Sequence, residues 1–246
     1  MSQNSQFGAM LLGAFDVPAG TWFPWHEHPA HQLVWSARGV VAVKAGDAGW
    51  VLPPTRALWM PAGVRHRTGA LGRAQLRGIY ADPSQSPVSW PQPRMVVVRP
   101  LLRELLEYLT AEGVAPPARL RAEAVAFDLL EPLDVVPIVV PSPSDPRALD
   151  VAAAVLANPA DPRTLAEFGR DVGAAERTLA RIFVRECRMP FGTWRTQVRL
   201  RASLPLLAES TPLETVAYRV GYSSASAFVA AFRRAVGVTP GAYFAG

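Results

Sequence analysis

The sequence predicts an α+β fold with three parts in order along the chain: a β-barrel or sandwich, a pair of helices, and a region of helices alone. Between about residues 10 and 82, short apolar runs are interrupted every few residues by glycine or proline, a rhythm typical of closely spaced strands. Beyond residue 94, apolar residues recur at helical spacing. A chain of 246 residues, half of them hydrophobic, is long enough to bury the cores of two domains.

The helix pair is predicted within residues 91–144, after a proline-rich connector at residues 82–94. The first helix carries leucines at 101, 102, 105, 106 and 109, and the second, over about residues 119–130, carries an apolar stripe of Leu120, Ala124, Phe127 and Leu130. Such a pair can pack on the β-domain, or it can form a homodimer interface, which we expect here. The predicted domains are therefore residues 1–90, 91–144 and 145–246.

The last hundred residues contain a weak internal repeat. Residues 165–183 and 213–232 each read as a helix, a turn and a second helix, with Gly173 and Gly221 as the turn glycines. Apolar residues face inward in both second helices: Leu179, Ile182 and Phe183 in one, Phe228 and Phe232 in the other. A helix over residues 191–208 is predicted to join the two units. The repeat predicts a double helix-turn-helix domain that reads DNA.

The basic charge is concentrated in this helical region. All basic side chains except Lys44 are arginines, and residues 145–246 hold 13 arginines against 9 acidic residues. Between Arg177 and Arg201, seven arginines are opposed only by Glu186. This distribution indicates either a footprint for an anionic polymer such as nucleic acid, or a solvated arginine-rich surface.

The second unit, followed by "FRRAVGVTPGAY" at residues 232–243, resembles the C-terminal signature of the AraC/XylS family of bacterial transcription regulators. The turn glycine, helix, basic pair, Gly-Val-Thr-Pro and tyrosine occur in order, and the resemblance extends over roughly residues 145–244. It implies that two recognition helices enter successive major grooves on one face of the duplex. Pro205 departs from an ordinary connecting helix, because an interior proline removes a backbone hydrogen bond and kinks the helix.

Candidate DNA contacts follow from aligning the two units at their turn glycines, with one extra residue in the second turn. They are Glu176, Arg177, Ala180, Arg181 and Arg185 in the first unit, and Ser224, Ala225, Ser226, Val229 and Ala230 in the second. Arginine can donate two hydrogen bonds to one guanine, so the first helix is expected to read bases directly. The small side chains of the second make few discriminating hydrogen bonds. The alternative is that all these arginines hold only phosphates.

The resemblance also implies two departures in these helices. Family members often carry a serine cap at the position of Ala175 and an arginine at the position of Ala230. We therefore expect that the first recognition helix lacks an N-terminal side-chain cap and that the second lacks one base-contacting arginine.

The β-domain resembles the cupin superfamily. The first cupin motif is matched by Gly20, His26-Glu27-His28, Gln32 and Gly39 with every spacing kept, and the second by Pro61, Gly63 and His66. The resemblance implies that His26, His28, Gln32 and His66 stand at the metal-ligand positions, with Gln32 replacing the usual glutamate. His31 falls outside the motif.

Two uses of these histidines stay open. His26 and His28, two apart on a strand, project to one face where His66 can join them, and three imidazoles suit a divalent ion such as zinc or nickel. Alternatively, the imidazoles line an effector pocket without metal. Trp22, Trp35 and Trp59 are candidates to stack on an effector in such a pocket, although tryptophans are often simply core residues.

Two functional classes follow. The leading hypothesis is a sequence-specific transcription regulator, not an enzyme and without catalytic residues, that binds double-stranded DNA and senses a small-molecule effector or a metal. The alternative is a metal-dependent cupin enzyme, of dioxygenase or isomerase type, with an accessory DNA-binding tail. A purely architectural DNA binder would leave the barrel unexplained. RNA polymerase is a candidate partner, since a regulator either contacts polymerase or occludes a promoter.

The surroundings are predicted from cysteine and hydropathy. Cys187 is the single cysteine, so no disulfide framework is possible, and a reducing compartment is expected. The first residues lack a basic segment followed by a long apolar run, and no stretch is long enough to span a bilayer. We therefore expect a cytoplasmic protein with no membrane partner.

Overall fold

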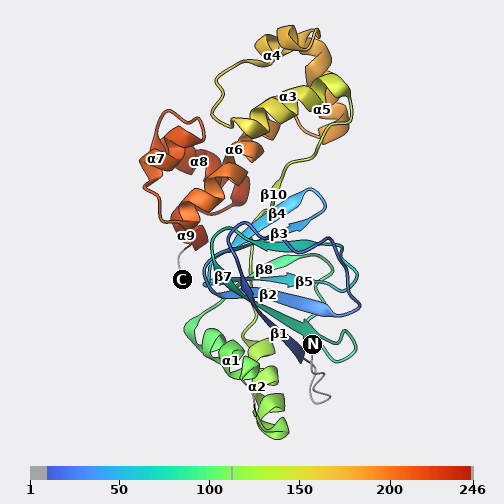
Figure 1. Cartoon of the computed structure of the whole chain (residues 1–246), viewed down its shortest axis with the longest axis vertical. Helices are drawn as coiled ribbons and strands as arrows, with labels where there is room; N and C mark the ends of the chain where they lie inside the picture. The colour runs from blue at the N-terminus through green and yellow to red at the C-terminus, as the bar shows by residue number, and fades with distance from the viewer. Residues whose placement is uncertain (1–9, 112, 245–246) are drawn as a thin grey trace. The chain divides into compact units, whose positions relative to one another are not determined.

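The computed structural model describes residues 10–111 and 113–244, which divide between two compact units (Figure 1). The first unit contains residues up to 135 apart from 47–49, and so holds most of the strands and the helix pair. The second contains residues 47–49 and 136–243. The α+β fold class predicted from the sequence is confirmed, with cupin-like antiparallel sheets in the first unit and helices in the second.

The strands form two antiparallel sheets. The larger has the order β1-β7-β2-β5-β8-β9 and the smaller the order β10-β4-β3-β6. In the smaller sheet, β10 pairs with Ala48 and Gly49, which belong to the second unit as β10 does. The strands are β1 (Met10–Val17), β2 (His31–Arg38), β3 (Val41–Ala45), β4 (Ala48–Leu52), β5 (Arg56–Met60), β6 (Arg67–Ala70), β7 (Ala74–Ala81), β8 (Arg94–Val97), β9 (Glu131–Leu133) and β10 (Ile138–Val139).

Helices α1 (Pro100–Thr110) and α2 (Pro116–Asp128) cover one face of the larger sheet. Because side chains alternate along a strand, Leu33 and Trp35 of β2 point to this face. They form a buried core with Leu102, Leu106 and Leu109 of α1. Truncating a buried leucine such as Leu106 to alanine is expected to cost about 2–5 kcal/mol. Gln32 is adjacent to Leu33 on β2, so its side chain points to the opposite face of the sheet. There it contacts His28 and His66.

The apolar stripe predicted for the second helix is wrong in part. Phe127 and Leu130 are buried, but Leu120 is 53% exposed and Ala124 is also exposed. The helix starts at Pro116, earlier than predicted, and the face that it buries is Ala122, Glu123, Ala126 and Phe127. Leu120 and Ala124 are each two residues from the buried Ala122. In a helix with 3.6 residues per turn, they therefore lie on the opposite, exposed side.

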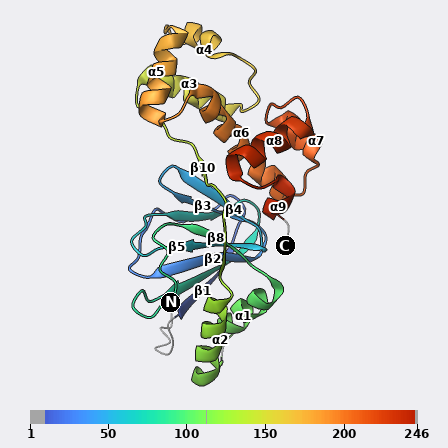
Figure 2. The ribbon, with the colours of Figure 1, turned by 180° about the vertical axis from the view of Figure 1, so that it is seen from behind.

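The second unit contains seven helices among the described residues: α3 (Pro146–Ala157), α4 (Leu165–Asp171), α5 (Glu176–Cys187), α6 (Phe191–Ala208), α7 (Leu213–Arg219), α8 (Ala225–Val236) and α9 (Pro240–Phe244). The last residue of α9 clusters with the first unit. The predicted connecting helix is confirmed as α6, and it continues through Pro205. Figure 2 shows α3 to α5 at one end of α6 and α7 and α8 near the other.

An aromatic core holds α5 and α6 together. The ring centroids of Phe183 and Phe191 are 5.0 Å apart, and those of Phe183 and Trp194 are 5.2 Å apart. The indole of Trp194 donates to the carbonyl of Pro141 at 2.8 Å, and the buried Cys187 thiol points to the same carbonyl at 3.7 Å. In the part of the chain that the structure describes, no helix has the length and apolar character needed to cross a membrane.

Candidate DNA-binding surface and histidine cluster

The first helix-turn-helix consists of α4, a four-residue turn and α5. Thr164 and Glu167 begin α4 with a capping box, in which each side chain accepts from the other residue's backbone N–H. Gly169 is required for the turn, because a Cβ there would lie 2.3 Å from the carbonyl oxygen of Ala174. Gly173 has a φ of +64°, a conformation that glycine adopts most readily. These features fix the start and direction of α5.

Helix α5 presents arginines on the side away from its core. Leu179, Ile182 and Phe183 are buried as predicted. Five residues line a groove of about 420 Å³ along the outer face: Arg177, Ala180, Arg181, Val184 and Arg185. The structure thus brings together four of the residues predicted to contact DNA, and Glu176 is exposed in the first turn of the same helix.

One arginine of this groove, Arg185, forms an ion pair. Arg185 donates to the carboxylate of Glu186 at 2.6 Å. That carboxylate also accepts from the backbone N–H groups of Ser144 and Asp145 at 2.8 and 3.0 Å. The Arg185 hydrogen bond and these two backbone donors lower the pKa of Glu186 to about 2. Glu186 therefore ties α5 to the N-terminus of α3.

The second helix-turn-helix has the same plan with a longer turn. Helices α4 and α7 both have 7 residues, and α5 and α8 both have 12. The extra residue predicted in the second turn is confirmed, because five residues (220–224) separate α7 from α8, whereas four (172–175) separate α4 from α5. Ser224 caps α8 by accepting from the N–H of Ala227 at 3.2 Å, whereas Ala175 gives α5 no side-chain cap. The predicted difference between the two caps is thereby confirmed.

The outer face of α8 lines a groove of about 780 Å³. Its lining includes four of the predicted contacts, Ala225, Ser226, Val229 and Ala230, together with Arg233 and Arg234. These two arginines were not predicted to contact DNA, although their adjacent pair in the last turn of the helix was a visible signal. Exposed positive charge is therefore present on α8 as well, but at its C-terminal end.

In the first unit, the side chains of His26, His28 and His66 converge. Backbone hydrogen bonds of 2.9 and 2.8 Å form an isolated bridge between His26 and His66. One ring nitrogen from each of the three residues lies within 4.8 Å of the others. Burial lowers the pKa of His66, which favours its neutral, metal-binding form.

Each of these imidazoles is oriented by a backbone carbonyl two residues away. Nδ1 of His26, His28 and His66 lies 2.7 to 2.8 Å from the carbonyl oxygens of Pro24, Ala30 and Val64 respectively. A carbonyl only accepts, so Nδ1 carries the proton, and Nε2 of each neutral ring is left with a free lone pair. Metal-bound histidines are oriented in this way.

Gln32 occupies the fourth position of the cluster. Its Oε1 is 3.0 Å from Nε2 of both His28 and His66. An unprotonated Nε2 and an amide oxygen are both acceptors, so neither can donate to the other. For neutral rings two arrangements satisfy them: a cation bound by the nitrogens and the oxygen, or a rotated amide whose NH₂ group donates to the imidazoles. The donor set therefore fits a divalent metal ion.

The tryptophans predicted to bind an effector do not join this cluster. Trp35 and Trp59 are fully buried in the core that faces α1 and α2. The Trp22 ring lies under two cations, Lys44 at 5.1 Å and Arg67 at 4.8 Å. His31 lies 5.2 Å from Trp59, ring to ring, and its Nδ1 accepts from the N–H of Ala62 at 3.0 Å. The sequence alone did not show which face of the sheet each of these side chains occupies, because the start of β2 at His31 was not known.

Comparison with known proteins bears on both units. The family model of a helix-turn-helix domain matches residues 168–246, and that of an AraC-like ligand binding domain matches residues 11–130. The HTH-type transcriptional regulator NimR of Escherichia coli K12 is 31% identical over 239 residues, which cover 94% of this chain and 87% of NimR.

The solved structures that match include ToxT from Vibrio cholerae, with 11% identity, a TM-score of 0.40, and coverage of 96% of this chain and 98% of ToxT. A DNA-binding transcriptional dual regulator from Escherichia coli K-12 is 26% identical with a TM-score of 0.36, over 40% of this chain and 88% of that one. Since NimR matches almost the whole chain and the two family models match its two parts, this protein belongs to the AraC family of transcription regulators and is not an enzyme.

Proposed function

We propose that α5 and α8 are the recognition helices of this regulator and that they contribute unequally to sequence recognition. The observation that carries the proposal is the groove on α5, where Arg177 and Arg181 are exposed. Neither has an ion-pair partner within 4.0 Å in the described residues, so both guanidinium groups are available for guanine edges.

The second recognition helix offers a different surface. Ala225, Ser226, Val229 and Ala230 can contact thymine methyl groups or a phosphate but carry few hydrogen-bond donors. Ser224 is committed to capping the helix. Arg233 and Arg234 lie near the C-terminal end of the groove and suit phosphates. We therefore assign base reading mainly to α5 and docking mainly to α8.

Selection of genomic DNA tests this function directly. The purified full chain would be incubated with fragmented DNA from its own genome, and the retained fragments would be sequenced and footprinted. We expect a specific site, with affinity that falls as salt rises because phosphate contacts release counterions. A double substitution Arg177→Ala and Arg181→Ala should abolish selection of that site. The matched control is Arg170→Ala, which removes an exposed arginine of α4. Uniform retention of all fragments would contradict the proposal.

For the first unit we propose one divalent ion, zinc or nickel, bound by His26, His28 and His66 with Gln32 as a fourth donor. The three oriented imidazoles support it. Such an ion would act as a Lewis acid toward a bound small-molecule effector, or it would stabilise the fold of the β-domain. These residues hold it through nitrogen and amide oxygen, which suit borderline divalent metals.

We also propose that the chain is a homodimer joined through α1 and α2. The support is a set of exposed apolar side chains on this pair: Leu101, Tyr108, Leu120 and Val125. In this assignment residues 1–90 sense the effector, residues 91–144 link and dimerise, and residues 145–246 bind DNA. A regulator of this kind works in the cytoplasm beside the chromosome, with RNA polymerase as a candidate partner.

A further inference from the structure

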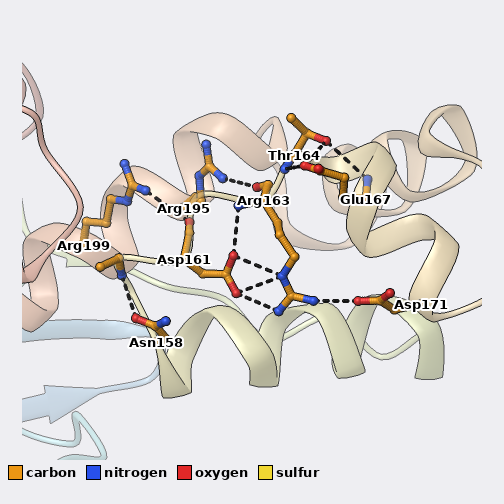
Figure 3. Close-up of polar contacts among 9 residues, drawn as sticks. Asn158, Asp161, Arg163, Thr164, Glu167, Asp171, Arg195 and Arg199 are labelled. Atoms are coloured by element: carbon orange, nitrogen blue, oxygen red, sulfur yellow. Dashed lines mark hydrogen bonds and ion pairs between the residues drawn. The ribbon is translucent and has the colours of Figure 1, made fainter.

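The loop between α3 and α4 is joined to the first helix-turn-helix through Arg163, which the buried carboxylate of Asp161 holds in place. Asp161 is 8% exposed, and its oxygens accept from the backbone N–H, Nε and Nη2 of Arg163 at distances between 2.6 and 3.1 Å. Nη1 of Arg163 donates in turn to Asp171, at the end of α4, at 2.6 Å. Figure 3 shows the Arg163 side chain between the carboxylates of Asp161 and Asp171. Arg163 therefore links the loop to the end of α4.

Two arginines of the connecting helix α6 bind the same loop. Nη1 of Arg195 donates to the carbonyl of Arg163 at 2.7 Å. Nε of Arg199 donates to the carbonyl of Pro159 at 2.9 Å, and its Nη2 lies 3.5 Å from the carbonyl oxygen of Asp161. Figure 3 shows both side chains extending from α6 toward the loop. These bonds fix the rotation of α6 relative to the first helix-turn-helix.

Arg199 also contacts the second helix-turn-helix. Its guanidinium carbon lies 5.6 Å from the centre of the Tyr222 ring. The turn glycine Gly221 approaches so closely that a Cβ there would lie 2.8 Å from Cα of Ala160 and 2.8 Å from Nη2 of Arg199. Arg199, which lies on α6, thus contacts both the loop before α4 and the turn before α8. Apolar packing between these helices has no preferred direction, whereas a planar guanidinium with two carbonyl acceptors does.

We propose that Arg199, held by the loop of residues 159–161, sets the distance and rotation between α5 and α8, and thereby sets the spacing of the two half-sites that the protein accepts. The proposal rests on the proposed function, in which both helices dock on DNA. Arg199 is a positioning residue in this view, because it acts on DNA only through the two helix-turn-helix units.

A series of operators with altered spacing tests the proposal. In each operator the two half-sites stay unchanged and the spacer gains or loses one or two base pairs. One added base pair moves a half-site by about 3.4 Å and rotates it by about 34°. We expect the wild-type chain to lose on the order of 10-fold or more in affinity for such an operator, the size of a typical single mismatch. Arg199→Met keeps side-chain length and should reduce this penalty to below about 3-fold.

A pair of glycine variants separates positioning from folding. Gly173 and Gly221 both have positive φ, +64° and +86°, so alanine is strained at either position. Only Gly221 has a neighbour within 4 Å of the added Cβ. We therefore expect Gly221→Ala to shift or broaden the preferred spacing and Gly173→Ala to leave it unchanged, even where both lower the melting temperature.

The outcomes separate the two proposals. Equal spacing profiles for the wild type and Arg199→Met, or equal effects of Gly221→Ala and Gly173→Ala on spacing, would overturn the positioning role and leave the recognition helices intact. A wild-type chain that tolerates every spacer would overturn it too. A chain that footprints no specific site would instead overturn the proposed function. Circular dichroism of each variant verifies the helical content, and the glycine pair decides the matter if Arg199→Met does not fold.

Discussion

Nε2 of His66 and Oε1 of Gln32 lie 3.0 Å apart beside two further imidazoles, and in a neutral ring protonated at Nδ1 both of these atoms are acceptors. This pairing is favourable when a cation lies among them, and it is the basis for expecting metal. Purified without a histidine tag, the chain should bind about one zinc or nickel ion, measured by mass spectrometry after dialysis. His28→Ala should abolish uptake, and His31→Ala, outside the cluster, should not. A wild-type chain that takes up no metal on titration would exclude the metal site.

Gln32→Glu should raise metal affinity. A carboxylate in place of the amide adds a negative charge beside the ion and restores the ligand type that the cupin resemblance implies. We expect competition with a chromogenic chelator to show a dissociation constant lower by on the order of 10-fold, equivalent to about 1.4 kcal/mol. A dissociation constant that Gln32→Glu leaves unchanged would contradict a role for residue 32 as a fourth metal donor.

The two recognition helices should respond differently to truncation. Arg181→Ala is expected to cost about 1 to 3 kcal/mol at the preferred site and to relax one base position, whereas Ser226→Ala should change little. Binding to a library of single-base operator variants at fixed salt measures both effects. Equal weakening of all variants by Arg181→Ala would show that Arg181 holds a phosphate. A larger, single-base effect of Ser226→Ala would reverse the assignment of the two helices.

Dimerisation should depend on the exposed apolar residues of the helix pair. Leu101 is 57% exposed and Leu120 is 53% exposed, so a charge at either position should be tolerated in a monomer. Leu101→Glu and Leu120→Glu should shift sedimentation from dimer to monomer at micromolar concentration. Leu156→Glu, at an exposed leucine of α3, is the matched control and should leave the oligomer unchanged. A wild-type monomer that binds its operator fully would remove the dimer proposal.

The caps of α5 and α8 can be exchanged. Ala175 has φ −66° and ψ 146°, the extended conformation of a capping residue, but no side-chain acceptor. Ala175→Ser should therefore stabilise the second unit by about 0.5–1 kcal/mol, and Ser224→Ala should destabilise it by about 1 kcal/mol. Urea unfolding followed by circular dichroism measures both. A loss of stability in Ala175→Ser would mean that the serine is oriented away from the helix.

Stability should depend on pH through Glu186. Its folded pKa of about 2 lies below the ordinary value near 4.5, chiefly because Arg185 and the backbone of Ser144 and Asp145 donate to the carboxylate. A lowered folded pKa stabilises the native state above the unfolded pKa, and this contribution is lost as pH falls from about 4.5 toward 2. Glu186→Gln should therefore differ most from the wild type at pH 7 and progressively less below pH 4.5. Glu209→Gln, at an exposed residue, is the control.

The helical part of the fold was predictable from the sequence because its signals are local. Turn glycines, a capping serine and buried residues at helical spacing each act within a few residues, and α6 matches its predicted range. The face of α2 was not predictable, because burial of Glu123 and exposure of Leu120 depend on where the helix meets a sheet distant in sequence. The role of Arg199 was equally hidden, since its hydrogen-bond acceptors in the loop lie about 40 residues away.

The histidine cluster was predictable only as a set of residues. Motif spacing placed His26, His28, Gln32 and His66 together, and the structure brings their side chains into contact. The position of the tryptophans depended on which strand face each occupies, and a shift of one residue reverses that face. Trp35 and Trp59 therefore belong to the helix-facing core.

The single cysteine has a practical consequence for spectroscopy. Burial, with the nearby carboxylates of Glu186 and Asp47, raises the pKa of the Cys187 thiol to about 11. Thiol reagents attack the thiolate, so Cys187 should react slowly at neutral pH in the folded protein. Cysteines introduced on α5 and α8 can then carry a pair of fluorophores or spin labels while the native cysteine stays in place. The distance between the two helices becomes directly measurable in the otherwise unaltered chain, with and without DNA.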